Sequence, residues 1–310
     1  MAKDKSVKKD GAPMIMTLAF WVCFLVFLGS GGYLGFRYVV EPYRTNEAFK
    51  GFKQAHEDIG TGDNLPRNAD GSLIAFNDLR KMNEDIIGWI TVPGTNIDYP
   101  VVKAPDEKDE FYLKHNIEKK SDRNGTIFAD YELKLEYKKK NQNIVLFGHH
   151  MRSGIMFNNL MKYDPFTSGT EFYKTFPVLT FNTIYEPGQW VVFGVMKINA
   201  NIKPQLANKQ DNPKFFGFIE SEFNEEKGEF TKFIKDLRDR SLLDTTSCVQ
   251  ITTEDELLLL STCSYEYDNY RTVFMCRKVR PGEQIDVSSA KKAANPIMPD
   301  GWKRGLGKSA

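Results

Sequence analysis

The stretch LLLLSTCSYEYDNYRTVFMCRKV (257–279) decides the fold class of this chain. It contains two apolar runs, LLLLSTC (257–263) and TVFMCRKV (272–279), with the aliphatic and β-branched content typical of strands. Ser264 to Tyr270 form a seven-residue connection, and Arg271 starts the second strand directly before its apolar run. The stretch therefore predicts two neighbouring strands with a short connection.

Six further segments upstream show the same strand pattern. They are GWITV (88–92), DYPVV (98–102), GTIFAD (125–130), NIVLFG (143–148), FPVLTF (176–181) and QWVVFGVMKI (189–198). Helices do not alternate with these strands, so the pattern favours a closed barrel or a sandwich over a parallel α/β sheet.

Three helices are predicted around the strands. Two precede them, from Thr45 to Ile59 and from Ser72 to Asp85, and Ser72 is a suitable N-cap for the second. The third lies in the polar stretch 199–245, where phenylalanine, isoleucine and leucine residues recur at helical spacing between Phe230 and Leu237. The expected fold is mainly β, with about eight strands, two leading helices and a helix inserted before the penultimate strand.

An uncharged run of 23 residues, Met14 to Phe36, precedes this domain. As a helix it is about 34 Å long, enough for a hydrocarbon core of about 30 Å. A cleaved signal peptide is the alternative, but its apolar region is usually shorter and ends in a small-residue cleavage site. Four lysines precede the run (Lys3, Lys5, Lys8 and Lys9), which predicts a cytoplasmic N-terminus and an extracellular domain.

The composition excludes several classes of protein. With 42 Lys and Arg against 41 Asp and Glu, the formal net charge of +1 does not suit a strongly basic nucleic-acid binder. Four cysteines in 310 residues are too few for a disulfide scaffold, and four histidines supply a zinc site poorly. We therefore expect neither a metal nor another cofactor.

The expected organisation has five parts. They are a cytoplasmic N-terminus (1–13), a transmembrane anchor (14–40), a helical stem and loop (41–71), a catalytic domain (72–285) and a basic, disordered tail (286–310).

His149, Cys263 and Arg271 form the candidate chemical site. Cys263 ends one predicted strand and Arg271 begins the next, so antiparallel pairing places them opposite each other at one rim. A nearby guanidinium favours a thiolate and offers fixed donors to an oxyanion. His149 follows another strand and is a candidate acid or base.

Ordinary structural roles compete with this interpretation. A cysteine in an apolar strand is more often a core residue than a nucleophile, and an arginine that begins a strand is usually a solvated charge. The pair His149–His150 is equally compatible with polar surface. The signatures of papain-like and caspase-like proteases are absent from the sequence.

Four stretches resemble a sortase, specifically of class B. They are NEDIIGWITVPGTNIDYPVVKAPDEKDEFYLKHN, NGTIFADYE, NIVLFGHHMRSGIMFNNLMKY and LLLLSTCSYEYDNYRTVFMCR, and the similarity runs in order from about residue 72 to residue 280. The resemblance implies an eight-stranded sortase β-barrel that carries a cysteine transpeptidase. Its motifs match His149, Cys263 and Arg271 as the catalytic residues, with His150 as the rival base.

The resemblance also suggests substrate contacts. Ser261 matches a position that touches the sorting peptide, and Leu113 in the YL pair matches one that lines its groove. Class B enzymes can carry an asparagine shortly before that pair, whereas this chain has EKDE (107–110), which leaves contacts from that loop open.

The implied activity is cleavage of an NPxTx-like sorting motif in secreted surface proteins. Cys263 attacks the threonine carbonyl, Arg271 stabilises the oxyanion, and His149 transfers the proton before a peptidoglycan amine accepts the protein. Two alternatives stay open. One is a pilin-polymerising sortase that uses a pilin lysine, and the other is a non-catalytic anchored barrel that binds the wall.

Overall fold

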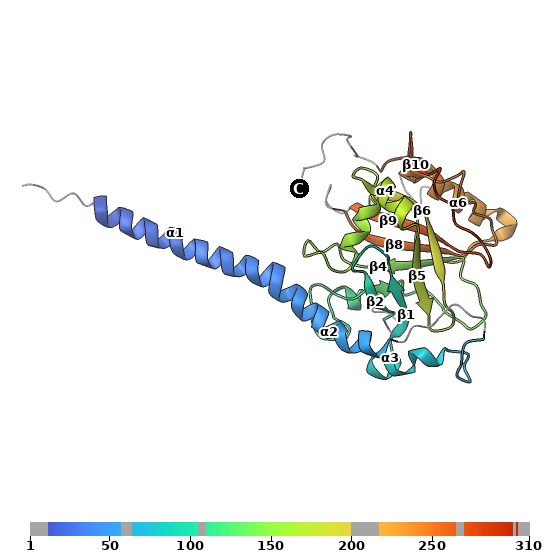
Figure 1. Cartoon of the computed structure of the whole chain (residues 1–310), viewed down its shortest axis with the longest axis horizontal. Coiled ribbons are helices and arrows are strands. Elements are labelled where there is room, and N and C mark those ends of the chain that lie inside the picture. Colours follow the sequence, from blue (N-terminus) through green and yellow to red (C-terminus); the bar gives the residue numbers. More distant parts are fainter. Residues whose placement is uncertain are drawn as a thin grey trace, which may run out of the picture. The chain divides into compact units, whose positions relative to one another are not determined.

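The computed structural model describes residues 12–56, 64–104, 110–199, 217–264, 270–299 and 302 (Figure 1). The chain forms two structural units, Met1–Asn46 and Glu47–Ala310. The first unit is helical where it is described. It contains α1 (Ala12–Gly35), the π-helical segment η1 (Phe36–Val40) and the start of α2 (Glu41–Ala55).

The apolar run predicted from the sequence is helical along its whole length. Among the described residues, Met14–Ala55 is one helical segment that is long and apolar enough to cross a membrane. None of its apolar window is buried inside the protein. Its exposed side chains include Leu25, Val26 and Phe27.

The second leading helix is shorter than the sequence predicted. Instead of one helix from Ser72 to Asp85, the structure has the 3₁₀ turn η2 (Ile74–Phe76) and α3 (Asn77–Met82). Ser72 is not an N-cap, because its N–H and hydroxyl both donate to Oδ1 of Asp70 in a local turn. The end of the first predicted helix, beyond residue 56, lies outside the described residues.

Eight strands close into a barrel in the order β1-β2-β3-β4-β8-β9-β6-β5, which confirms the predicted fold class (Figure 1). The pairs β2–β3 and β4–β8 are parallel and the others are antiparallel. The strands are β1 (Ile86–Thr91), β2 (Asp98–Val102), β3 (Phe128–Ala129), β4 (Asn143–Phe147), β5 (Val178–Thr183), β6 (Gln189–Asn199), β8 (Leu257–Cys263) and β9 (Tyr270–Lys278).

Short helical elements connect the strands. They are η3 (Phe111–Leu113) before β3, η4 (Phe157–Tyr163) and α4 (Gly169–Thr175) between β4 and β5, and η5 (Glu225–Lys227) and α6 (Glu229–Arg240) between β6 and β8. The inserted helix predicted in 199–245 is α6, which packs its apolar face against β6.

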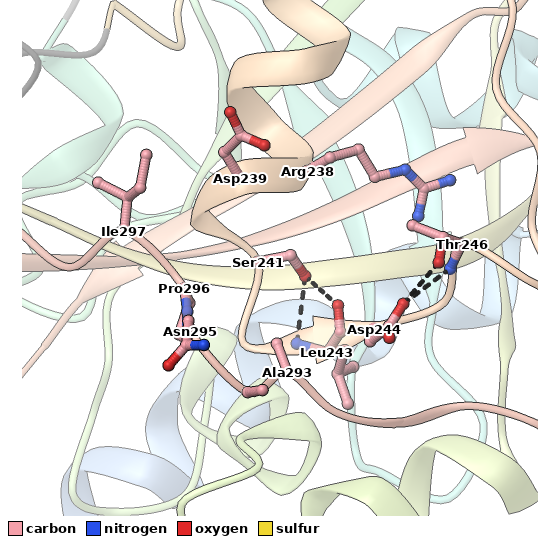
Figure 2. A pocket seen from close by; sticks show the side chains of 11 residues that line it. Arg238, Asp239, Ser241, Leu243, Asp244, Thr246, Ala293, Asn295, Pro296 and Ile297 are labelled. Atoms are coloured by element: carbon pink, nitrogen blue, oxygen red, sulfur yellow. Dashed lines mark hydrogen bonds between the residues drawn. The ribbon is translucent and has the colours of Figure 1, made fainter.

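The prediction of a disordered tail from residue 286 was wrong for residues 286–299. β10 (Lys291–Lys292) pairs antiparallel with β7 (Leu243–Asp244), and Val287 and Ala290 are buried. The backbone then continues beside the end of α6 (Figure 2). There the N–H of Ile297 donates to the carbonyl of Asp239. A few apolar side chains and main-chain bonds therefore order a segment whose lysine-rich composition suggested solvation.

Candidate active site

Three neighbouring strands bring the predicted site residues to one edge of the barrel. β8 lies between β4, its parallel partner, and β9, its antiparallel partner (Figure 1). Cys263 is the last residue of β8, Arg271 is the second residue of β9, and His149 follows β4 by two residues. The ends of β4 and β8 and the start of β9 meet at the same edge.

Cys263 and Arg271 are direct cross-strand partners in the β8–β9 ladder, as the sequence predicted. The N–H of Ser264 donates to the carbonyl of Tyr270 at 2.8 Å. Because hydrogen-bonded and non-hydrogen-bonded pairs alternate, Cys263 and Arg271 form a pair of the second kind. Such pairs bring the side chains closest, with Cα atoms about 4.5 Å apart. The thiol and the guanidinium therefore start from adjacent backbone positions.

The charge of Arg271 is not neutralised by any described carboxylate. Its Nη1 lies 3.5 Å from the carbonyl oxygen of Tyr270, which is at the outer limit of a hydrogen bond. Within the described ranges, no aspartate or glutamate forms an ion pair with it. A half-buried guanidinium with unused donors suits an oxyanion that develops beside Cys263.

The β4–β8 register carries His149 toward the same edge. Phe147 pairs with Ser261, and the N–H of Gly148 continues the ladder onto the Ser261 carbonyl at 3.1 Å. His149 and Cys263 each follow the last pair by two residues. A Cβ on residue 148 would lie 2.6 Å from the ring of Phe157. Only a glycine therefore fits at this position directly after β4.

A backbone carbonyl holds the ring of His149. Nε2 of His149 lies 2.8 Å from the carbonyl oxygen of Leu113, at the end of η3. Because a carbonyl can only accept, Nε2 carries the proton in this bond. In the neutral ring, Nδ1 is then the nitrogen with a free lone pair, which is the position a general base needs.

His150 is bound to a different carbonyl. Its Nδ1 lies 3.0 Å from the carbonyl oxygen of Cys263, and its backbone forms an isolated bridge with Met156. The two adjacent histidines thus have separate partners, one in η3 and one at the end of β8. His150, the rival candidate for the base, is therefore bonded to the main chain of the candidate nucleophile.

Comparison with known proteins identifies the family. A family model described as the sortase domain matches residues 90–279, which is more than half of the chain. The chain belongs to the sortase family. Its relatives include Sortase B of Listeria monocytogenes, 29% identical over 79% of this chain and 89% of that protein, and Sortase B of Staphylococcus aureus, 30% identical over 62% and 68% respectively.

A solved structure supports the same family. The crystal structure of sortase B from B. anthracis in complex with AAEK1 superposes with a TM-score of 0.61 at 26% identity, covering 78% of this chain and 99% of that one. The resemblance to class B sortases is therefore confirmed. As a sortase, the chain is a cysteine transpeptidase that acts on surface proteins.

The two predicted substrate contacts of this sortase lie close to the strand edge. Ser261 precedes Cys263 by two residues on the same face of β8, and its buried Oγ has no hydrogen-bond partner among the described residues. An unsatisfied buried hydroxyl costs about 1–3 kcal/mol. Leu113 is partly buried against the core, and its carbonyl oxygen is the one that holds His149.

Sequence reasoning missed a buried ion pair that involves β6, the second neighbour of β9. Nζ of Lys197 in β6 lies 2.8 Å from Oδ2 of Asp164 and 2.9 Å from Oγ1 of Thr272, and the charged groups are almost completely buried. Lys197 precedes Ile198, the β6 partner of Arg271. A lysine inside the otherwise apolar run QWVVFGVMKI was the available signal.

The described residues offer no alternative chemical site of similar quality. No group of three or more His, Cys, Asp or Glu among them is arranged to hold a metal ion. A pocket of about 400 Å³ lies between the end of α6, β7 and residues 293–297 (Figure 2). It contains none of the predicted site residues, and the N–H groups of Leu243 and Thr246 in its wall are already bonded to side-chain oxygens.

Proposed function

We propose that this sortase is a membrane-anchored class B transpeptidase. It cleaves an NPxTx-like sorting motif in secreted proteins and transfers them to a cell-wall amine. The observation that carries the proposal is the cross-strand pair of Cys263 and Arg271, with His149 at the end of the adjacent parallel strand. The class B names of the relatives support the choice of motif.

In the acylation step, the proton of the Cys263 thiol passes to Nδ1 of His149, and Sγ attacks the carbonyl carbon of the motif's threonine. The oxyanion of the tetrahedral intermediate accepts hydrogen bonds from the guanidinium of Arg271. The intermediate collapses when the C–N bond breaks and Nδ1 of His149 returns the proton to the leaving amine. A thioester between Cys263 and the threonine remains.

In the transfer step, an amine of a peptidoglycan stem or bridge attacks the thioester carbonyl. Nδ1 of His149 accepts the amine's proton, Arg271 again stabilises the oxyanion, and the Cys263 sulfur leaves and is protonated. Throughout, Nε2 of His149 keeps its proton in the bond to the Leu113 carbonyl, so Nδ1 is the nitrogen that accepts and returns protons.

For the peptide's path, we assign substrate contacts to Ser261 and Leu113. The hydroxyl of Ser261, which has no partner in the described part of the chain, lies on the same strand face as Cys263, and Leu113 lies in the element that holds His149. The adjacent stretch EKDE (107–110) lies outside the described residues except for Glu110.

For the topology, we assign residues 14–40 to a single membrane span. The helix Met14–Ala55 is long and apolar enough for this role. Four lysines near the N-terminus favour a cytoplasmic location for residues 1–13, with the catalytic domain extracellular.

The test uses the full chain in detergent micelles with a fluorogenic NPxTx peptide, with and without a peptidoglycan stem-peptide amine. We expect cleavage after the threonine, an amide-linked product when the amine is present, and no turnover by Cys263→Ala. Transfer to a pilin lysine in place of the wall amine would indicate the pilin-polymerising alternative. Binding without cleavage would indicate the non-catalytic one, and either result would overturn the proposal.

A further inference from the structure

Both polar atoms of the peptide group that follows Cys263 are bonded. The carbonyl oxygen of Cys263 accepts a hydrogen bond from Nδ1 of His150 at 3.0 Å. The N–H of Ser264 donates to the carbonyl of Tyr270 at 2.8 Å. A planar peptide that is held at both its C=O and its N–H has its orientation fixed, which also fixes the ψ angle of Cys263.

The direction of the Cys263 carbonyl explains why a side chain from the β4 end binds it. In a non-hydrogen-bonded antiparallel pair, the C=O groups point away from the partner strand, so this carbonyl points away from β9 and toward β4. The β4–β8 ladder ends with the hydrogen bond from the N–H of Gly148 to the carbonyl of Ser261. Two residues further along each segment, the ring of His150 is hydrogen-bonded to the Cys263 carbonyl.

The backbone of His150 is itself held firmly. Its bridge to the fully buried Met156 closes a turn, and the N–H of Phe157 donates to the carbonyl of His149 at 3.0 Å. Gly154 supplies a positive φ of 85° inside that turn. The turn therefore presents two neighbouring imidazoles to two different carbonyls, one of which belongs to Cys263.

We propose that His150 is a positioning residue that fixes the Cys263–Ser264 peptide and, through it, the direction of the Cys263 thiol toward Arg271. The inference rests on the proposed role of Cys263 as the nucleophile. His150 acts as an Nδ1–H donor, since its partner is a carbonyl that can only accept. Its role therefore needs no exchange of protons with substrate, in contrast to that of His149.

The kinetic test compares three substitutions that differ in where they place a donor. In His150→Asn the amide nitrogen takes the place of Nδ1, since both are attached to Cγ. In His150→Gln the amide nitrogen lies near the position of Nε2, and His150→Ala has no donor. We expect His150→Ala and His150→Gln to lower kcat about five- to tenfold, as one lost neutral hydrogen bond predicts, with KM unchanged. His150→Asn is expected to stay within about twofold of wild type.

The pH profile separates positioning from acid–base chemistry. All three His150 variants are expected to retain the shape of the wild-type kcat–pH profile, whereas His149→Ala loses the limb that belongs to the base. Equal losses in His150→Asn and His150→Ala would overturn the proposal, as would full activity in His150→Ala. A changed profile in the His150 variants would overturn it by making His150 the acid or base.

A second measurement does not depend on activity. NMR spectra of the full chain with ¹³C,¹⁵N-labelled histidine, assigned with the His149 and His150 variants, report which ring nitrogen carries the proton. We expect an Nδ1–H tautomer for His150 and an Nε2–H tautomer for His149. The opposite tautomer at His150, or rapid averaging there, contradicts the proposal. Wild-type protein that cleaves no sorting peptide would refute the proposed function. The NMR measurement would still show whether His150 donates from Nδ1 to the Cys263 carbonyl.

Discussion

The carbonyl oxygen of Leu113 lies 2.8 Å from Nε2 of His149, so an element 36 residues earlier in the chain sets the tautomer of the candidate base. The η3 backbone that presents this carbonyl is fixed in turn. The N–H of Thr126 donates to the neighbouring carbonyl of Tyr112 at 2.9 Å, and the phenol of Tyr112 donates to Asp85 at 2.6 Å. The position of the base thus depends on contacts made outside the barrel edge.

Gly125→Ala is expected to reduce activity by displacing that carbonyl. Gly125 has a φ of +62°, and a Cβ there would lie 2.6 Å from the carbonyl oxygen of Tyr112 and 2.9 Å from that of Leu113. We expect a lower kcat together with a lower melting temperature. Gly282→Ala is the matched control, because Gly282 has a φ of +73° with nothing within 4 Å of the added Cβ. Equal kcat in the two variants would show that displacing the Leu113 carbonyl does not affect catalysis.

His149→Ala is expected to lose about 10²–10⁴ in kcat, the usual contribution of general acid–base catalysis. His149→Gln is a sharper version, because its amide can still donate to the Leu113 carbonyl but cannot accept and return a proton. We expect both variants to be equally inactive in steady-state turnover while His149→Gln melts close to wild type. Substantial activity in His149→Gln would show that the ring serves only to hold η3.

Arg271→Lys is expected to be nearly as damaging as Arg271→Ala. A guanidinium offers two donors in a fixed plane, which an ammonium cannot reproduce. Loss of an oxyanion donor typically costs about 10²–10³ in rate. Arg280→Lys is the control, because Arg280 pairs with Asp255 at 2.7 Å and has no proposed role in the chemistry. An active Arg271→Lys would mean that charge alone is sufficient.

The sequence predicted the parts of the site that depend on local pattern. Two apolar runs with a short connection imply an antiparallel pair, and the register that opposes Cys263 to Arg271 follows from where the runs end and begin. The position of His149 after a strand was predictable in the same way. Its role and those of Cys263 and Arg271 stay predictions until the variants above are measured.

The contacts that hold these residues were not predictable from local pattern. The partners of His149 and His150 are main-chain carbonyls 36 and 113 residues away, and a carbonyl leaves no signature in the sequence. The pair Lys197–Asp164 joins residues from separate elements. β7 and β10 have two residues each, too few to show a strand period.

Glu283→Gln is expected to destabilise the domain at neutral pH and to have little effect in acid. Two hydrogen bonds from the buried guanidinium of Arg277, at 2.5 and 2.8 Å, hold the pKa of Glu283 below its usual range. A lowered pKa in the folded state gives stability that is present above the unfolded-state pKa and is lost as the pH falls through the folded-state value. Melting temperatures of both proteins from pH 7 down to pH 3 should converge. A constant difference between the two melting temperatures across that range would contradict a stabilising role of the ionised Glu283.

The central claim is that Cys263 carries the acyl group, and the most direct measurement is the mass of the trapped intermediate. The full chain is mixed with an NPxTx peptide, quenched in acid within seconds, digested and mapped by mass spectrometry. We predict a thioester on Cys263 that contains the peptide up to its threonine. It should persist in Cys248→Ala and be absent in Cys263→Ala, which keeps its fold by circular dichroism. An acyl group on Cys248 or Cys276, or peptide turnover by Cys263→Ala, would contradict the account.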